Sequence, residues 1–353
     1  MTLATVPDRA APGMQRRSIA GRLAPYSGES YYGRPALKPA PWDWTVSGYI
    51  FLAGLAGSAQ GLAALGQIAD RGRYRGMITN ARFLAAASTA VGAGLLIADL
   101  RTPQRWYNML RIFRPTSPMS IGTYVLSGFG GLSGVTLLGE LAGGRNGVGR
   151  AVRRAADVAQ IGAAVTGAGA STYTAALLSA TSTPVWSVQP RRLGLKFGLS
   201  AAACGAAALS IGERVGGRDA NADRLDGIAA AATLAGLAAE TLLARPAGRS
   251  SRHGPAPGSE HPPPDPVHLV LGSALPIAAY GLGRLSRERT MLSVAGSLAV
   301  LAGGMWLRHR TLTKGMRSVK DPRRYFRVAQ AGAQATPLPR GGRQPAGRPR
   351  EAR

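Results

Sequence analysis

The sequence predicts an all-α fold, a membrane bundle of about eight transmembrane helices. Long blocks of Ala, Leu, Gly, Val and Ile with few charges occupy the middle of the chain. Arg, Pro and Gly dominate both ends. The mean hydropathy of +0.01 therefore averages two unlike populations, and it does not argue for a soluble protein.

These populations divide the chain into three regions. We expect a basic, largely irregular tail over residues 1–42, the transmembrane bundle over residues 43–310, and a second basic tail over residues 311–353. The C-terminal tail is expected to become disordered toward its end, because it is rich in Arg, Gly and Pro and poor in apolar residues. No cleavable signal peptide is expected, because residues 1–40 contain no apolar run of the required length.

The first predicted span covers residues 44–68, which contain no charged side chain. At about 1.5 Å per residue, this segment crosses a hydrocarbon core of about 30 Å. Trp42, Trp44 and Tyr49 stand at its start, as expected for an aromatic belt at the membrane interface.

Further apolar segments complete the bundle. The second is bounded by Arg82 and Asp99, the fifth carries Lys196, and the sixth contains Glu240. An even number of spans predicts that both chain ends lie on the same side of the membrane. The segments after the first cover residues 80–100, 118–141, 155–180, 193–211, 225–243, 267–282 and 291–307.

A soluble, alanine-rich bundle is the competing fold. Its helices would show a polar stripe at the helical period, and the first, third and fourth spans almost entirely lack one. Glycines at G-x-x-x-G spacing favour the membrane bundle, because small residues let helices approach closely in lipid. Such pairs occur at Gly57 and Gly61 and at Gly130 and Gly134.

The formal net charge of +26 is typical of proteins that bind nucleic acid. Here the arginines lie in the tails and between apolar blocks rather than along one face of a folded domain. We therefore expect no nucleic-acid partner. Basic loops of membrane proteins instead favour the cytoplasmic side and meet anionic lipid.

The cysteine and histidine content predicts a chain without its own redox metal. Cys204 is the single cysteine, so the chain cannot supply the thiolates of an iron–sulfur cluster. Bound haem would require paired histidines inside the membrane. His253 and His261 fall in a proline-rich loop, whereas His268 and His309 fall near helix ends. We expect neither haem nor an iron–sulfur cluster in this chain.

Ionisable side chains near helix ends are the remaining candidates for chemistry, because charges at membrane depth are costly. For Glu213 and Lys196 we favour an interfacial charge that reaches water or a partner. For Asp99 and Glu140, a functional role and a plain interfacial role both remain open.

The segment that follows the second span has the most distinctive pattern. It begins with Asp99 and Leu100 and continues through an aromatic-rich stretch to RPTSPMS, residues 114–120, and Gly122. This pattern resembles the NrfD/PsrC family, the membrane subunit of polysulfide reductase and related respiratory complexes. In that family Gly-Arg-Pro follows Asp-Leu, whereas this chain has Arg101, Thr102 and Pro103 there. Trp stands in the family at the position of Ile121. The motif residues carried over from the family are Pro115, Ser117, Pro118, Met119, Ser120 and Gly122, together with Tyr173 farther along the chain.

Other segments extend the resemblance over most of residues 31–327. YIFLAGLAGSAQG, residues 49–61, is similar to the family's first helix, and YTAALLSATSTPVW, which begins at Tyr173, is similar to the end of its fourth. The resemblance implies a multi-pass protein of the plasma membrane that is not catalytic alone. It also implies a quinone, such as menaquinone, bound in the bundle, and electron exchange with a separate ferredoxin-like iron–sulfur subunit. That subunit usually serves a molybdopterin oxidoreductase.

Quinone chemistry moves electrons and protons together, so it needs hydrogen-bond donors for the ring oxygens and a path for protons. The candidate residues are Asp99, Arg101, Tyr124 and Glu140, which flank the second and third spans. Tyr124 is equally suited to be a plain interfacial aromatic residue.

Two other functions remain open. One is a membrane anchor or scaffold without quinone turnover, which the substitutions at Thr102 and Ile121 keep possible. The other is a transporter, which would use broken helices and buried charge pairs at the membrane midplane. The position of the charges at helix ends argues against the transporter.

Overall fold

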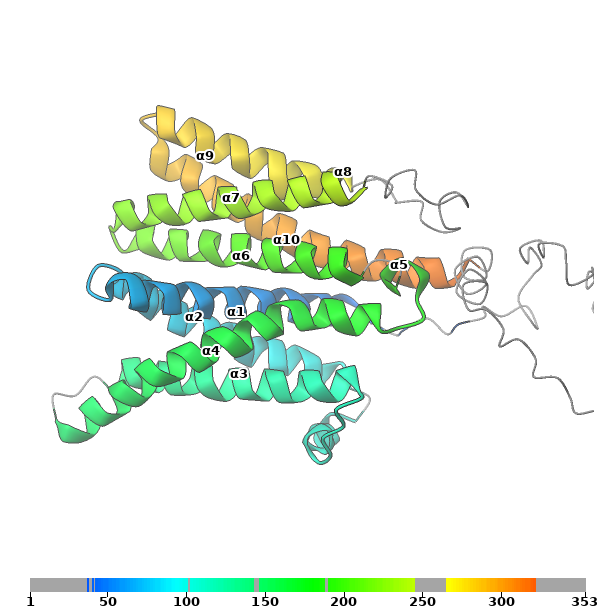
Figure 1. The fold of residues 1–353 in the computed structure, drawn as a ribbon. Helices are drawn as coiled ribbons and strands as arrows, with labels where there is room; N and C mark the ends of the chain where they lie inside the picture. Colours follow the sequence, from blue (N-terminus) through cyan, green and yellow to red (C-terminus); the bar gives the residue numbers. More distant parts are fainter. Residues whose placement is uncertain are drawn as a thin grey trace, which may run out of the picture.

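The structure is a computed structural model that describes residues 37, 40, 42–100, 102–142, 146–187, 190–244 and 265–321. These residues form helices and no strands. Eight of the helical segments are long and apolar enough to cross a membrane (Figure 1). The predicted all-α membrane bundle is therefore confirmed.

Every predicted span coincides with a long helical segment. Two short helices lie between spans, η2 (Pro103–Leu110) and α5 (Pro184–Ser187). The seventh span joins α8 (Pro266–Leu269), a π-helical turn η3 (Val270–Ala274) and α9 (Leu275–Leu285). The other spans are α1 (Trp44–Asp70), α2 (Arg75–Ala98), α3 (Pro118–Leu141), α4 (Gly147–Ser179), α6 (Pro190–Val215), α7 (Asp219–Ala244) and α10 (Arg289–Val319).

Several helices extend beyond the apolar segments that predicted them. α4 begins at Gly147 and carries a basic first part, and α10 continues past residue 310 to Val319. Hydropathy locates only the part of a helix that lies in hydrocarbon, so charged turns outside it are missed. The expectation that Arg82 bounds the second span is wrong, because α2 begins at Arg75 and Arg82 lies inside it.

Side-chain caps define the starts of several helices, among them α1, α3 and α4. Asp43 precedes α1 and accepts a hydrogen bond from the backbone nitrogen of Thr45 at 2.7 Å. Asn146 precedes α4 and accepts one from the backbone nitrogen of Gly149 at 2.9 Å. At α3 the cap is Ser117. Short polar side chains at these positions satisfy backbone donors that have no partner within the helix.

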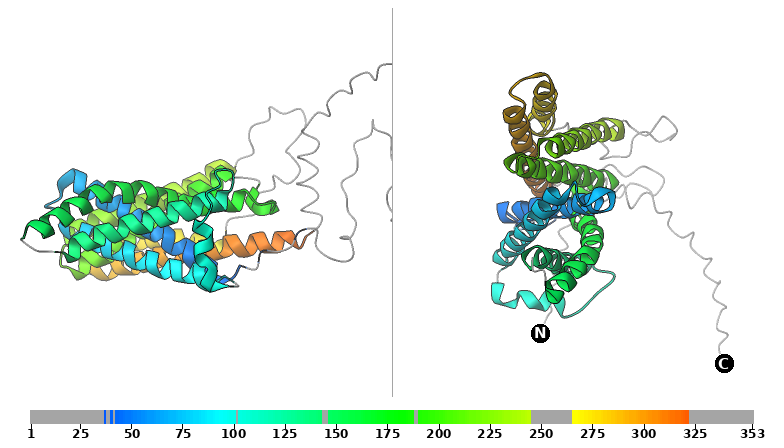
Figure 2. Two further views of the ribbon diagram at one scale, coloured as in Figure 1. Left: turned by 90° about the horizontal axis from the view of Figure 1, so that it is seen from below. Right: turned by 90° about the vertical axis from the view of Figure 1, so that its left-hand side faces the viewer.

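α1 is the central helix of the bundle. It contacts α2 and α4 on one side and α6 and α10 on the other (Figures 1 and 2). In its most apolar stretch 67% of the residues are buried, against 22% for α3, which lies at the periphery. Contact between α1 and α4 is close at Gly57, where an added Cβ would lie 2.2 Å from the carbonyl oxygen of Gly167. By contrast, an added Cβ at Gly61 or Gly134 would meet no atom within 4 Å.

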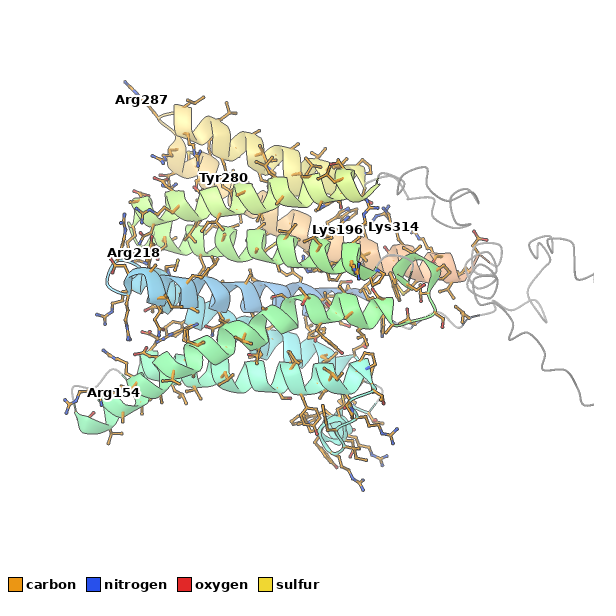
Figure 3. All side chains as sticks on the ribbon, in the orientation of Figure 1. Arg154, Lys196, Arg218, Tyr280, Arg287 and Lys314 are labelled. Carbon is orange, nitrogen blue, oxygen red and sulfur yellow. The ribbon has the colours of Figure 1, made fainter. Side chains whose placement is uncertain are left out.

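The bundle has two different ends. We call the end at which α1 begins and α10 ends the tail end. The opposite end, where short turns join α1 to α2 and α6 to α7, is the turn end. Arg154, Arg218 and Arg287 lie at the turn end, and Lys196 and Lys314 lie toward the tail end (Figure 3). The start of α1 and the end of α10 share one end of the bundle, as an even number of spans predicts.

Candidate functional site

A cavity of about 480 Å³ lies at the tail end, between α1, α2, α3 and α4. Side chains of η2, including Trp106 and Leu110, line it from the side of the membrane interface. Its volume falls within the roughly 300–1,000 Å³ of small-molecule sites, which are mostly apolar with a few polar groups. The apolar lining includes Val46, Ile50, Leu96, Met109, Leu126 and Leu177.

The polar groups of the lining are largely without partners. The buried hydroxyl oxygens of Thr89 and Thr174 have no hydrogen-bond partner. Tyr49 of α1 and Tyr173 of α4 also line the cavity, and within the described part of the chain neither hydroxyl makes a hydrogen bond. Buried polar groups are normally paired, so unpaired donors around a cavity point to a ligand that accepts hydrogen bonds.

Asp99 is the single carboxylate in this lining. The Thr45 hydroxyl lies 3.3 Å from its Oδ1 but only 2.5 Å from Asp43. Because a hydroxyl has one proton, Thr45 gives Asp99 at most a weak hydrogen bond. Asp99 is half-buried and makes no ion pair with any described residue. The predicted neighbour Arg101 lies outside the described residues.

The family motif forms the turn that leads into α3. Ser117 caps the helix by accepting a hydrogen bond from the backbone nitrogen of Ser120 at 3.4 Å, and Pro118 follows at the first helical position. The Ser120 hydroxyl accepts a hydrogen bond from the backbone nitrogen of Arg114 at 2.9 Å. Pro115 lies in the turn itself. These contacts fix where α3 begins beside the cavity.

Two further motif residues shape the cavity directly. Met119 and Gly122 line it, and the Tyr173 ring lies against Gly122. A Cβ added at Gly122 would lie 1.7 Å from Cζ of Tyr173, so only glycine leaves room for this ring. The structure therefore brings Gly122 and Tyr173 together, although they come from different parts of the motif.

Tyr124 does not line the cavity. Its hydroxyl donates a hydrogen bond to the carbonyl oxygen of Leu110 at 2.9 Å, and Phe113 packs edge-on against its ring at 5.0 Å. These contacts attach the segment between α2 and α3 to the bundle. They fit the alternative in which Tyr124 is a plain interfacial aromatic residue.

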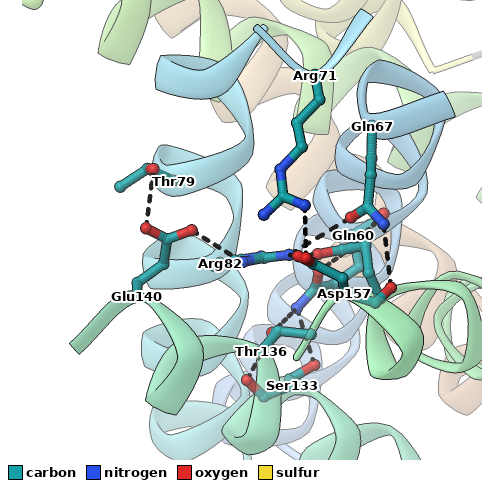
Figure 4. Close-up of polar contacts among 10 residues, drawn as sticks. Gln60, Gln67, Arg71, Thr79, Arg82, Ser133, Thr136, Glu140 and Asp157 are labelled. Carbon is teal, nitrogen blue, oxygen red and sulfur yellow. Dashed lines mark hydrogen bonds and ion pairs between the residues drawn. The ribbon is translucent and has the colours of Figure 1, made fainter. Parts of the chain in front are cut away.

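Glu140 lies at the turn end, far from Asp99 along the α2–α3 pair. It accepts hydrogen bonds from Arg82 Nη1 at 2.8 Å and from the Thr79 hydroxyl at 3.2 Å (Figure 4). Arg82 is 1% exposed. Its other nitrogens donate to Asp157 at 3.2 Å and to Gln160 at 2.9 Å.

This buried network joins α1, α2, α3 and α4. Gln160 donates to the side-chain oxygen of Gln60 at 2.6 Å, and Gln60 donates to Ser133 at 3.2 Å and Thr136 at 3.1 Å (Figure 4). Arg71 pairs with the second oxygen of Asp157 at 2.5 Å. We call this group, centred on Arg82, the Arg82 network. The charges of this network are paired with one another, so a structural role is enough to account for their burial.

The remaining predicted charges have partners. Glu213 is buried and pairs with Arg218 at 2.8 Å, as the interfacial alternative expects. That hydrogen bond raises the pKa of Arg218, which lies in the turn after α6. Lys196 pairs with Glu240 across α6 and α7.

No three His, Cys, Asp or Glu side chains gather into a metal site among the residues that the structure describes. Cys204 is buried between α6 and α10, where its thiol faces the carbonyl of Val300. His309 of α10 lies 3.2 Å from the Ser47 hydroxyl of α1. His253 and His261 lie outside the described residues. The absence of haem and of a cluster stays a prediction.

Sequence reasoning missed several residues that the structure brings to these two places. Tyr49 and Trp42 were assigned to an interfacial aromatic belt, yet both line the cavity. The Trp42 ring stacks on the Trp186 ring, with 5.7 Å between the ring centroids. Gln60 and Gln160 gave a usable signal, because each is an amide within an apolar segment. Such side chains need partners in lipid, but the pattern does not say which ones.

The sequence of this chain was compared with known protein families and with curated proteins. A family model described as polysulphide reductase, NrfD, matches residues 35–255. The match includes α1 to α7 and therefore both the cavity and the Arg82 network. No curated protein matches the chain.

Proposed function

This chain belongs to the polysulphide reductase NrfD family, and we propose that it is a quinone-binding subunit of a respiratory complex. Membership in the family makes it a multi-pass membrane subunit of a redox complex. The observation that supports the finer assignment is the tail-end cavity, where unpaired donors and one carboxylate meet an apolar lining.

The cavity suits the chemistry of a quinone. A quinone ring is flat and apolar and carries two carbonyl oxygens, so it requires apolar walls and hydrogen-bond donors. Val46 and Leu126 belong to such walls. The hydroxyls of Tyr49, Tyr173 and Thr89 are donors without partners among the described residues. A ring oxygen that accepted a hydrogen bond from Thr89 would remove the cost of leaving that buried hydroxyl unpaired.

Asp99 is the residue that we assign to proton exchange. A bound quinone would supply two-electron, two-proton chemistry, and each proton must pass between the ring and water. Asp99 reaches both, because it lines the cavity and is half-buried at the tail end. Its weak pairing leaves the carboxylate available to take up and release a proton.

The electron partner in this proposal is a separate ferredoxin-like iron–sulfur subunit that serves a molybdopterin oxidoreductase in the plasma membrane. Tagged protein purified from native membranes is expected to carry such a subunit, with iron–sulfur signals in electron paramagnetic resonance that respond to added quinol. A purified complex whose iron–sulfur signals do not change when quinol or quinone is added would contradict this part of the proposal.

Quinone binding can be tested on the purified chain in lipid nanodiscs. A menaquinone analogue with a photoreactive group should label the tail-end parts of α2, α3 and α4, and excess menaquinone should suppress the label. Ala93→Trp should abolish labelling, because Ala93 lines the cavity and the indole would fill it.

The matched control is Ala90→Trp, an exposed position on the same helix that does not line the cavity. It should label like the wild-type chain. Equal labelling of both variants, or labelling that menaquinone does not suppress, would favour a membrane anchor without quinone turnover.

A further inference from the structure

We propose that a second cavity, at the turn end, binds the phosphate group of an anionic phospholipid. This cavity has a volume of about 330 Å³ and is lined by Arg71, Gly72, Arg75, Ile78, Glu140 and Arg153. The residues come from the turn between α1 and α2, the start of α2, the end of α3 and the start of α4. The assignment does not depend on quinone binding at the opposite end.

The charges of the lining leave a positive excess. Glu140 is neutralised by Arg82, which does not line the cavity, and Arg71 is paired with Asp157. Arg75 and Arg153 make no hydrogen bond or ion pair with any residue that the structure describes. Arg75 and Arg153 therefore line one cavity without an ion-pair partner among the described residues.

Arginine is suited to phosphate because its planar guanidinium donates two parallel hydrogen bonds to one anion. Hydrogen bonds between charged groups are also stronger than those between neutral groups. An anion held between Arg75 of α2 and Arg153 of α4 would also link two helices that the Arg82 network joins deeper in the bundle.

The position of the cavity favours lipid as the source of the phosphate. α2 begins at Arg75 and α3 ends at Leu141, so the cavity lies where the spans leave the hydrocarbon. Leu138 and Leu141 flank Glu140 on α3 and are 57% and 62% exposed. A headgroup near the arginines would keep its acyl chains beside such apolar surface. Basic pockets between transmembrane helices bind lipid headgroups in the same way.

The test is lipid binding by the full chain in detergent micelles, followed by native mass spectrometry and thermal unfolding. Phosphatidylglycerol should bind and raise the unfolding temperature, since a ligand that binds only the folded state stabilises it. Phosphatidylcholine should bind at least about tenfold more weakly, because its headgroup carries no net negative charge.

Arg75→Gln combined with Arg153→Gln should weaken phosphatidylglycerol binding about tenfold or more, the loss expected for charge-assisted hydrogen bonds. The matched control is Arg154→Gln combined with Arg287→Gln. Those arginines are exposed at the same end and do not line the cavity, so binding should be unchanged (Figure 3). Helical circular dichroism of each variant establishes that it is folded.

Three results would overturn the assignment. The first is equal phosphatidylglycerol binding by the Arg75/Arg153 variant and the control. The second is equal binding of phosphatidylcholine and phosphatidylglycerol by the wild-type chain. The third is a rise in unfolding temperature with inorganic phosphate alone that equals the rise with phosphatidylglycerol at the same concentration. That result would identify a site for free phosphate rather than for lipid.

Discussion

The tail end and the turn end of the α1–α4 group each place a carboxylate next to α3, but they hold it differently. Glu140 at the turn end accepts hydrogen bonds from Arg82 and Thr79. The Asp99 carboxylate at the tail end has one hydrogen bond among the described residues, of 3.3 Å, from a hydroxyl that also donates to Asp43. Asp99 lines a cavity of about 480 Å³.

The comparison separates two uses of polar groups in a membrane protein. Around Arg82 the donors and acceptors satisfy one another, so the network holds helices together without requiring a ligand. Around the cavity the hydroxyls of Thr89 and Thr174 stay unpaired while apolar side chains surround them. Buried polar groups are costly when they have no hydrogen-bond partner, and this supports the proposal that a ligand binds at the tail end.

The largest effect should come from breaking the network. Arg82→Ala removes the only ion-pair partner that Glu140 has among the described residues, and it also takes a partner from Asp157. Removing one partner of a buried ion pair costs about 3–5 kcal/mol. We expect the variant to lose most of its folded population, measured by thermal unfolding in detergent. Arg154→Ala, exposed at the same end, should unfold like the wild-type chain. Equal stability of the two variants would contradict a structural network.

The next effect concerns activity alone. Asp99→Asn should lower quinone-linked electron transfer about 10²-fold or more, because positioned acid–base groups contribute on that scale. Folding should change by only about 0–1 kcal/mol, as for weakly paired charges near the surface. The measurement is quinol oxidation or quinone reduction in membranes, normalised to assembled complex.

Glu140→Gln is the counterpart of Asp99→Asn at the other end. It should reduce stability while leaving the activity per assembled complex near the wild-type value, because Glu140 lies in the network and not at the cavity. Normal specific activity in both variants would move the anchor without quinone turnover ahead of the quinone-binding subunit.

A smaller effect should follow from reshaping the cavity. Gly122→Ala places a Cβ where the Tyr173 ring lies, and such overpacking costs about 1–3 kcal/mol. We expect quinone affinity to fall about tenfold as Tyr173 moves. Gly128→Ala on the same helix is the control, because its Cβ would meet no atom within 4 Å. Titration of both variants with a quinone analogue measures the difference, and equal affinities would refute the role of Gly122.

The smallest effect should come from Tyr124→Phe. The change removes a single hydrogen bond to Leu110, worth about 0.5–1.5 kcal/mol, and leaves the ring packed on Phe113. Thermal unfolding should shift slightly, and electron transfer per assembled complex should stay unchanged. A large loss of activity at normal stability would return Tyr124 to the list of quinone ligands.

The two ends also differ in how much of each could be predicted from the sequence. The motif from Ser117 to Gly122 was visible because it resembles the family's pattern of consecutive residues. The contact that requires glycine at position 122 was not visible, because the Tyr173 ring comes from another helix. Asp99 was visible as a charge at the end of an apolar segment. The Arg82 network was not visible, since Arg82 looked like the boundary of a span.

The all-α membrane bundle, its eight candidate spans and the family of the chain could all be predicted from the amino-acid sequence. Hydropathy and motif spacing are properties of consecutive residues, so they need no tertiary information. Which polar side chains meet depends on how the helices pack. Tyr49 and Tyr173 share one cavity, and Gln60, Arg82 and Gln160 share one network. Helices in lipid can be apolar on every face, so periodicity does not reveal which face of each helix turns toward its neighbours.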